Sequence, residues 1–135
     1  GSPVTVFLVG LQLVEEGASP RGYVEVRHIG EQVSLMLHDV LHAFVRQDAT
    51  LALKVAIRDE AVDTEYRSAM SNLITFMMEA RAISQVNVLW VLRALERIGD
   101  HVCNIAEQVL YLATGRDMRH SSKDEMRALL EKTKD

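Results

Sequence analysis

Two pairs of carboxylates stand four residues apart in segments that have the apolar periodicity of helices. Asp59 and Asp63 form one pair, and Glu96 and Asp100 form the other. Side chains at this spacing are neighbours on a helix surface, and two like charges there disfavour the helix by roughly 0.3 kcal/mol. Two such pairs in one chain therefore need an explanation other than helix stability.

The order of the segments predicts that the two pairs meet. If the two helices run antiparallel from a link near residue 82, the pairs stand roughly 30 and 25 Å along them, at 1.5 Å per residue. We therefore expect four carboxylates to converge on one rim of a helical bundle. Such a set repels itself unless cations or protons intervene, and oxygen ligands suit Mg²⁺, Mn²⁺ or iron. Bundles are known to hold metals between facing carboxylates.

The spacing also fits a plainer interpretation, in which the acids belong to a solvated surface. Arg58, Arg93 and Arg97 lie nearby in the sequence and would neutralise them as ordinary ion pairs. Spacing alone leaves both interpretations open. Gly99, between the acids of the second pair, costs roughly 0.5–1 kcal/mol relative to alanine inside a helix. Its place on the apolar stripe predicts a close approach of a neighbouring helix.

Three segments carry apolar residues at helical spacing, at about 26–44, 48–78 and 84–114. Asp48 is expected to cap the start of the second helix, Ser84 the start of the third, and Gly115 stands just past the end of the third. We therefore predict an all-α fold, an antiparallel up-down-up three-helix bundle. The stripes are Ile29, Val33, Met36, Leu37, Val40 and Phe44; Leu51, Val55, Val62, Tyr66, Ala69, Leu73 and Phe76; and Val88, Val91, Leu95, Ile98, Val102, Ile105, Val109 and Leu112.

The remaining segments flank this bundle. Residues 1–25 are interpreted as a tag scar, a partial helix and a linker left from a preceding repeat, residues 26–120 as the bundle, and residues 121–135 as a polar tail with a weak helical pattern. An apolar partial helix needs a surface to cover it, and a second copy of the chain is the expected candidate.

Composition excludes several classes of function. The net charge is −4 and the pI about 5.7, so nothing favours nucleic acid or an anionic membrane as a partner.

The single cysteine, Cys103, has no matched base and is interpreted as a buried thiol. His38 and His42 have zinc-ligand spacing but no evident third ligand, so we interpret them as exposed. Trp90 and the pair Met77–Met78 are assigned to the core or an interface. We find no nucleophile with an orienting base, and hence no hydrolytic site.

Several runs resemble the PhoU family of bacterial phosphate-transport accessory and regulatory proteins. The resemblance covers about residues 11–120 and is carried by LERIGDH at 95–101, NIAE at 104–107, GRDMRH at 115–120, DEAVD at 59–63 and TFMME at 75–79. PRGYVEV at 20–26 is similar to the segment that joins the family's two repeats. The chain thus looks like the second of two three-helix repeats, preceded by the end of the first.

The resemblance implies a metal site. The family's E/D-x-x-x-D motif, which binds iron or other metal ions in some members, maps onto Asp59–Asp63 and Glu96–Asp100. Asn104 lies one turn beyond Asp100 on the same face and is a further candidate ligand. Residues 3–10, PVTVFLVG, depart from the family pattern and lack the acidic motif, so the corresponding half-site of the first repeat is missing.

The resemblance also implies a function. A PhoU-like chain would be a cytoplasmic, non-enzymatic adaptor that dampens phosphate-starvation signalling. It would bridge the ATPase of a phosphate ABC transporter and a sensor histidine kinase, and would be peripheral to the membrane only through these partners. A homodimer is expected separately, because the unpaired partial helix can be covered by, or exchanged with, a second copy of the chain. The alternative is a carboxylate-rich metal protein with storage or redox activity. Redox di-iron sites add histidines on the acidic face, and His101 lies off that face, which disfavours the alternative.

Overall fold

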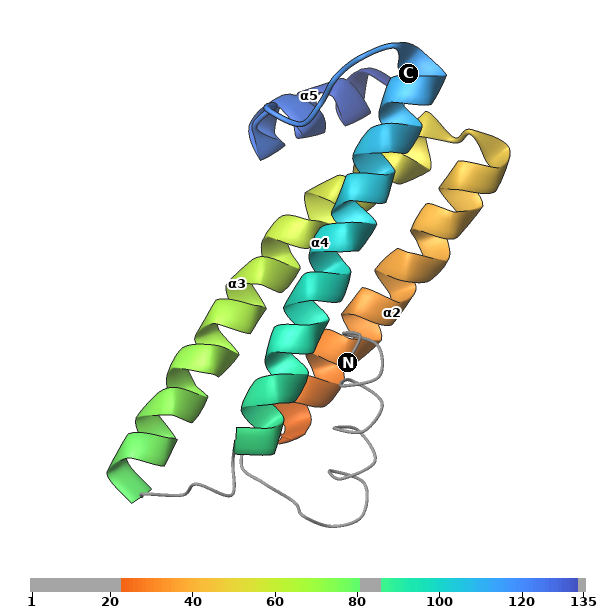
Figure 1. Ribbon diagram of the computed structural model, residues 1–135. Helices are drawn as coiled ribbons and strands as arrows, with labels where there is room; N and C mark the ends of the chain where they lie inside the picture. Colours follow the sequence, from red (N-terminus) through yellow and green to blue (C-terminus); the bar gives the residue numbers. More distant parts are fainter. Residues whose placement is uncertain (1–22, 81–85, 134–135) are drawn as a thin grey trace. The chain divides into compact units, whose positions relative to one another are not determined.

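A computed structural model describes residues 23–80 and 86–133 of the chain, and its regular structure there is entirely helical (Figure 1). The helices are α2 (Tyr23–Arg46), α3 (Ala49–Ala80), α4 (Val86–Thr114) and α5 (Lys123–Thr133). The prediction of an all-α fold with three long helices packed as a bundle is confirmed. The partial helix predicted before residue 17, the start of the linker and the cap at Ser84 lie outside the described residues.

The described residues divide into two compact units. Unit 1 contains residues 23–33 of α2, 62–80 of α3 and 86–98 of α4. Unit 2 contains residues 34–46 of α2, 49–61 of α3, 99–114 of α4 and the whole of α5. Each long helix therefore supplies one segment to each unit. Each of the two acidic pairs has one member in unit 1 and the other in unit 2.

Unit 1 has a core made almost entirely of aliphatic side chains, as expected from the periodicity of the three segments. The one aromatic residue buried there is Tyr66, from α3. The other buried apolar residues of this unit are Val26, Ile29, Val33, Val62, Ala69, Leu73, Val88, Val91, Leu92, Ala94 and Leu95.

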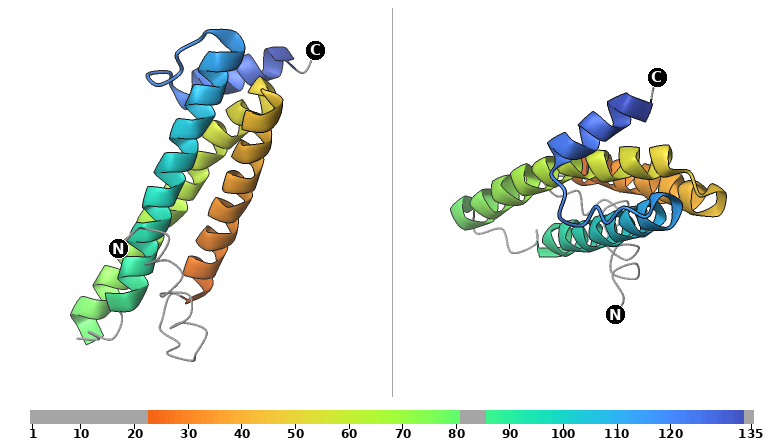
Figure 2. Two further views of the ribbon diagram at one scale, coloured as in Figure 1. Left: turned by 45° about the vertical axis from the view of Figure 1, so that its right-hand side comes forward. Right: turned by 90° about the horizontal axis from the view of Figure 1, so that it is seen from above.

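Unit 2 has a core of smaller residues, with a methionine from each of three segments. Met36 of α2, Met118 of the loop after α4 and Met126 of α5 are all buried. Because Met126 is only 2% exposed, α5 is packed against the unit and does not extend into solvent. In both views of Figure 2, α5 runs beside the first turns of α3. The segment interpreted as a polar tail thus contains a docked helix.

The predicted cap at the start of α3 and the predicted left-handed residue after the end of α4 are confirmed. The Leu51 amide donates a hydrogen bond to Asp48 Oδ1 at 3.0 Å, which satisfies a donor that the first turn of α3 leaves open. Gly115 follows the last residue of α4, has a φ of 74°, and donates its N–H to the Tyr111 carbonyl at 2.8 Å. This left-handed conformation after a helix is the one that glycine adopts without strain.

Several apolar residues of the predicted stripes lie outside the core. Leu37 is 38% exposed, Phe44 52% and Leu112 64%, so the prediction that they face the core is wrong. Trp90 and Met78 are also largely exposed, so they are not core residues either. The helical period places a residue on the broad apolar side of a helix, but its burial depends on which neighbour covers that position. No helix among the described residues is long and apolar enough to cross a membrane.

Candidate functional site

The structure separates the predicted ligands by burial. Asp59 of α3 is only 8% exposed and is the one charged side chain buried among the described residues. Asp63 is half-buried, whereas Glu96, Asp100 and Asn104 are exposed. Asp59, Asp100 and Asn104 belong to unit 2, and Asp63 and Glu96 belong to unit 1. A buried carboxylate costs free energy unless it is paired and hydrogen-bonded. Asp59 is therefore the predicted ligand whose burial needs a structural explanation.

Within unit 2, the Asp59 carboxylate lies against α4 at Gly99. A Cβ placed on Gly99 would stand 3.8 Å from Asp59 Oδ1, which is an ordinary van der Waals distance. Gly99 therefore faces a carboxylate. An alanine at this position would fit without moving α3 and α4 apart. The next residue along α4 is Asp100, so the structure brings one acid of each predicted pair to the same part of unit 2.

The predicted ligands do not form a ready metal site. Across residues 23–80 and 86–133, no three His, Cys, Asp or Glu side chains are grouped so that they could hold one ion. A hard cation such as Mg²⁺ requires about six oxygen ligands, part of which water supplies. Binding at these residues would therefore require side chains to turn toward the ion, and the metal site stays a prediction.

Cys103 of α4 belongs to the same unit as the buried acid. Burial, followed by the charge of Asp59, raises the pKa of the thiol from its ordinary 9.0 to about 12, while Lys123 acts in the opposite direction. The thiol also donates a hydrogen bond to Glu107 Oε1 at 3.7 Å. Cys103 is therefore protonated at neutral pH and is a poor nucleophile. The sequence analysis interpreted Cys103 as a buried thiol, whereas the side chain is only partly buried in the structure.

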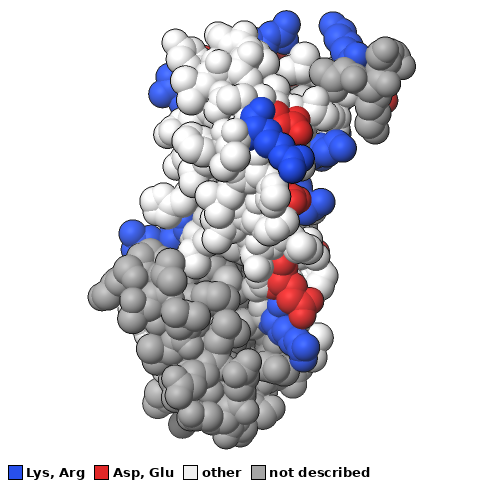
Figure 3. All heavy atoms as spheres, turned by 90° about the vertical axis from the view of Figure 1, so that its right-hand side faces the viewer, with Lys and Arg blue, Asp and Glu red and all other residues white. Residues whose placement is uncertain are grey.

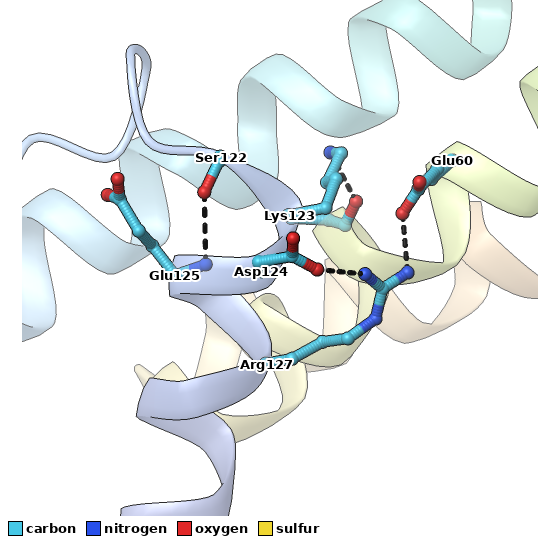
Figure 4. Close-up of polar contacts among 7 residues, drawn as sticks. Glu60, Ser122, Lys123, Asp124, Glu125 and Arg127 are labelled. Atoms are coloured by element: carbon cyan, nitrogen blue, oxygen red, sulfur yellow. Dashed lines mark hydrogen bonds and ion pairs between the residues drawn. The ribbon is translucent and has the colours of Figure 1, made fainter.

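The sequence interpretation missed the contacts that α5 makes on α3. Lys123 Nζ donates to the Ala56 carbonyl at 2.6 Å, and the Arg127 guanidinium pairs with both Glu60 and Asp124 (Figure 4). The hydrogen bond from the Glu125 amide to Ser122 Oγ, at 3.1 Å, caps the start of α5. The signal in the sequence was the pattern Lys123, Met126, Arg127, which puts two cations and one apolar side chain on one side of a short helix.

One of the arginines expected to neutralise the two acidic pairs forms an ion pair with a different acid. Arg58 pairs with Asp39 of α2, with Nη1 and Oδ2 3.5 Å apart. In unit 1, His28 Nδ1 lies 2.7 Å from Glu65 Oε2. His38 and His42 are exposed, as predicted, with ring centroids 4.5 Å apart. These pairs are exposed or partly exposed, so each contributes little to stability.

Each unit also has an open hollow on its surface. The hollow of unit 1 has a volume of about 400 Å³ and is lined by side chains that include Glu25, Asn72 and Glu79. The hollow of unit 2, of about 670 Å³, is lined by Asn104, Glu107, Gln108, Tyr111, Leu112, Asp117 and Arg119. Arg119 binds both carboxylate oxygens of Asp117 and holds the pKa of that group well below its usual range. Asn104, a predicted ligand, thus borders a surface with an ion pair and exposed apolar side chains.

Comparison with known proteins decides the family. The PhoU domain family matches residues 26–109. The chain belongs to the PhoU family. A phosphate-specific transport system accessory protein PhoU homolog of Pseudomonas aeruginosa is 58% identical over 123 residues, which are 90% of this chain and 51% of that protein. The accessory protein PhoU of Escherichia coli (strain K12) is 41% identical over 109 residues, which are 79% of this chain and 45% of that protein.

A solved PhoU structure supports the same assignment. The crystal structure of PhoU from Pseudomonas aeruginosa superposes with a TM-score of 0.71 at 61% sequence identity, covering 78% of this chain and 51% of that chain. The chain therefore spans about half the length of the curated PhoU relatives that it matches. The resemblance identified from the ERIGD and NIAE runs is confirmed, and those runs lie inside the matched domain.

Proposed function

We propose that this chain acts in phosphate-specific transport as a non-enzymatic accessory and regulatory protein. The observation that carries the proposal is the 58% identity, over 90% of the chain, to a protein named as an accessory protein of that system. The finer role that we propose is to dampen phosphate-starvation signalling as a cytoplasmic adaptor. In this role the chain binds the ATPase of a phosphate ABC transporter and a sensor histidine kinase, and it meets the membrane only through them.

A binding measurement tests the adaptor role. The purified chain is immobilised and offered the transporter ATPase and the cytoplasmic part of the sensor kinase, each alone and both together. Capture of both supports the adaptor, and capture of neither contradicts it. An unrelated ABC ATPase serves as the control for non-specific binding. A complementary measurement follows a phosphate-starvation reporter in cells that lack their own PhoU, where the chain should lower reporter expression in high phosphate.

We further propose that Asp59, Asp63, Glu96, Asp100 and Asn104 take part in binding divalent or iron ions. The resemblance to metal-binding family members supports this proposal, and the absence of a three-donor group among the described residues weighs against tight binding. Metal analysis after purification without chelator, and titration with Mn²⁺, test it directly. The variant Asp59→Asn/Asp100→Asn removes two candidate ligands of unit 2, and Asp124→Asn, an exposed acid on α5, is the matched control. Equal binding by both variants contradicts the assignment.

A homodimer is part of the same proposal. Along residues 34–46 of α2, exposed apolar side chains include Leu35 (51%), Leu41 (51%), Phe44 (52%) and Val45 (79%). In Figure 3, the charged side chains of the described surface form a column along one side, and the area beside this column is uncharged. An exposed apolar surface of this kind marks an interface, and two copies of the chain together match the length of one relative. Sedimentation analysis of the chain and of Leu41→Glu/Val45→Glu should give a dimer and a monomer respectively. A monomer for both would contradict the proposal.

A further inference from the structure

His38 and His42 stand one turn apart on the surface of α2. Both residues are exposed, and their ring centroids are 4.5 Å apart. Two imidazoles that bind one ion through nitrogens at about 2.0–2.1 Å have ring centroids about 4.5–5 Å apart. The two rings therefore already have the separation that one shared ion requires. Neutral imidazole nitrogen is a ligand that suits Zn²⁺ and similar transition-metal ions.

A carboxylate stands beside this pair. Asp39 Oδ1 lies 3.6 Å from His38 Nδ1, and Asp39 Oδ2 lies 3.5 Å from Nη1 of Arg58, on α3. Histidines that bind metals commonly donate their second ring N–H to a carboxylate, which orients the ring. A small turn of the His38 ring would form this hydrogen bond and leave Nε2 for the ion. Asp39 is thus placed to orient His38 as a ligand.

One chain supplies only half of a zinc site here. No third His, Cys, Asp or Glu joins the pair in a group that could hold an ion, within the part of the chain that the structure describes. Zinc in a structural site takes four protein ligands in a tetrahedron. Two imidazoles leave two positions open, which water or a second pair of ligands must fill.

The surroundings of the pair favour a second copy of the chain as the source of those ligands. The histidines share one side of α2, about 120° wide, with Leu35, Leu41 and Val45. These apolar side chains are 51%, 51% and 79% exposed. The one charged residue between Leu35 and Val45 is Asp39, which lies outside this side of the helix. The stripe is thus apolar and uncharged around the histidines, as an interface would be.

Twofold symmetry would bring the two histidine pairs together. In such a dimer the same patch of both copies meets itself. The histidines occupy the middle of the stripe from Leu35 to Val45. An antiparallel pairing of two α2 helices along this stripe therefore places one histidine pair opposite the other.

We propose that His38 and His42 of two copies together bind one zinc ion, which bridges the homodimer along α2. Each copy supplies two imidazole nitrogens, and the four complete a tetrahedral site. This inference rests on the homodimer proposed above and names the ion that holds it. The site is separate from the proposed site of acidic side chains, which would hold its ion through oxygen.

Sedimentation equilibrium of the chain, in EDTA and at a known concentration of free Zn²⁺, tests the bridge. At free zinc about ten times its dissociation constant from the dimer, the dissociation constant of the dimer should fall about tenfold. Calorimetric titration should find one zinc ion for each two chains. His38→Ala and His42→Ala should each remove both effects. His120→Ala, which removes an exposed histidine of the loop after α4, should keep them.

The outcomes separate the bridge from the homodimer itself. A dimer in EDTA that zinc does not strengthen overturns the bridge and leaves the homodimer. One zinc ion for each chain, or a zinc effect that survives in His42→Ala, also overturns the bridge. A monomer in EDTA that becomes a dimer with zinc supports the bridge and contradicts dimerisation by apolar contacts alone. A monomer under both conditions contradicts both proposals.

The orienting role of Asp39 has its own test. Asp39→Asn should weaken zinc binding about tenfold, because the carboxylate that orients the ligand is lost. Arg58→Ala removes the ion pair of the same carboxylate and leaves the carboxylate in place, so it should keep the zinc affinity. Equal losses in these two variants would overturn the role of Asp39. Circular dichroism of every variant checks that the bundle is folded before zinc is added.

Discussion

The Asp59 carboxylate lies against the backbone of α4 at Gly99, so that a Cβ at position 99 would stand 3.8 Å from its Oδ1. This relationship joins the two features that made the sequence unusual, a glycine inside a helix and a pair of acids at helical spacing. Gly99 is buried, and what faces it is a carboxylate rather than the backbone of another helix. The contact is loose enough that the glycine is not required by space.

We therefore predict that Gly99→Ala stabilises the protein. Alanine is favoured over glycine in a helix interior by roughly 0.5–1 kcal/mol, and the new methyl group would make an ordinary contact with Asp59. Urea denaturation followed by circular dichroism should show this increase in the free energy of unfolding. A loss of stability would indicate that α3 approaches α4 more closely at Gly99 than the structure shows. If metal binding by Asp59 needs the space, Gly99→Ala would weaken it while raising stability.

At Gly115, substitution by alanine is expected to lower the free energy of unfolding instead of raising it. This residue has a φ of 74°, and no other group lies within 4 Å of the point where a Cβ would stand, so its role lies in backbone conformation and not in packing. Gly115→Ala should lower the free energy of unfolding by about 1 kcal/mol, because the left-handed conformation is costly for residues with a Cβ. Gly115→Asn should cost less, since asparagine tolerates this conformation. Equal losses for the two variants would contradict the explanation.

Removal of the Asp48 cap should also be measurable. Asp48 Oδ1 accepts the Leu51 amide at the start of α3. Asp48→Ala leaves that donor without its partner and should lower the free energy of unfolding by about 1 kcal/mol. Asp48→Asn keeps an acceptor at the same place and is the control, with an expected loss near zero. Thermal unfolding of the three proteins in one buffer compares them directly.

Cys103 should make stability depend on pH in the alkaline range. The pKa of its thiol is about 12 in the folded protein and near 9.0 in the unfolded chain. The unfolded state therefore loses the proton first as the pH rises. The free energy of unfolding should be unaffected by this group at neutral pH. It should then fall above pH 9 by up to about 1.4 kcal/mol per unit.

Cys103→Ala provides the comparison for this pH dependence. Other groups that titrate in the alkaline range are present in both proteins, so the difference between their unfolding curves isolates the thiol. The unmodified chain should lose stability faster than the variant between about pH 8.5 and 10.5. Parallel curves would show that the thiol is not shifted in the folded state.

Local sequence predicted the helices well because each signal acts within one or two turns. The stripe of α4, the cap at Asp48 and the left-handed residue at Gly115 are all decided by neighbours in the chain. The same local reasoning failed for Leu37 and Leu112, which follow the apolar period yet are exposed. It described residues 121–135 as a polar tail with a weak helical pattern and did not predict that α5 is docked, because a single fully buried side chain, Met126, anchors this helix.

The sequence by itself thus determined the helical elements, their caps and membership of the PhoU family, since these depend on local periodicity and on runs of identical residues. Only the tertiary structure decided which acid is buried and which residues of α3 the cations of α5 contact. Asp59 and Asp100 have the same charge and the same helical spacing from a partner, yet one is 8% exposed and the other is open to solvent. The Asp59 carboxylate lies against α4 at Gly99, and burial of this kind depends on segments far apart in the chain, so no local pattern records it.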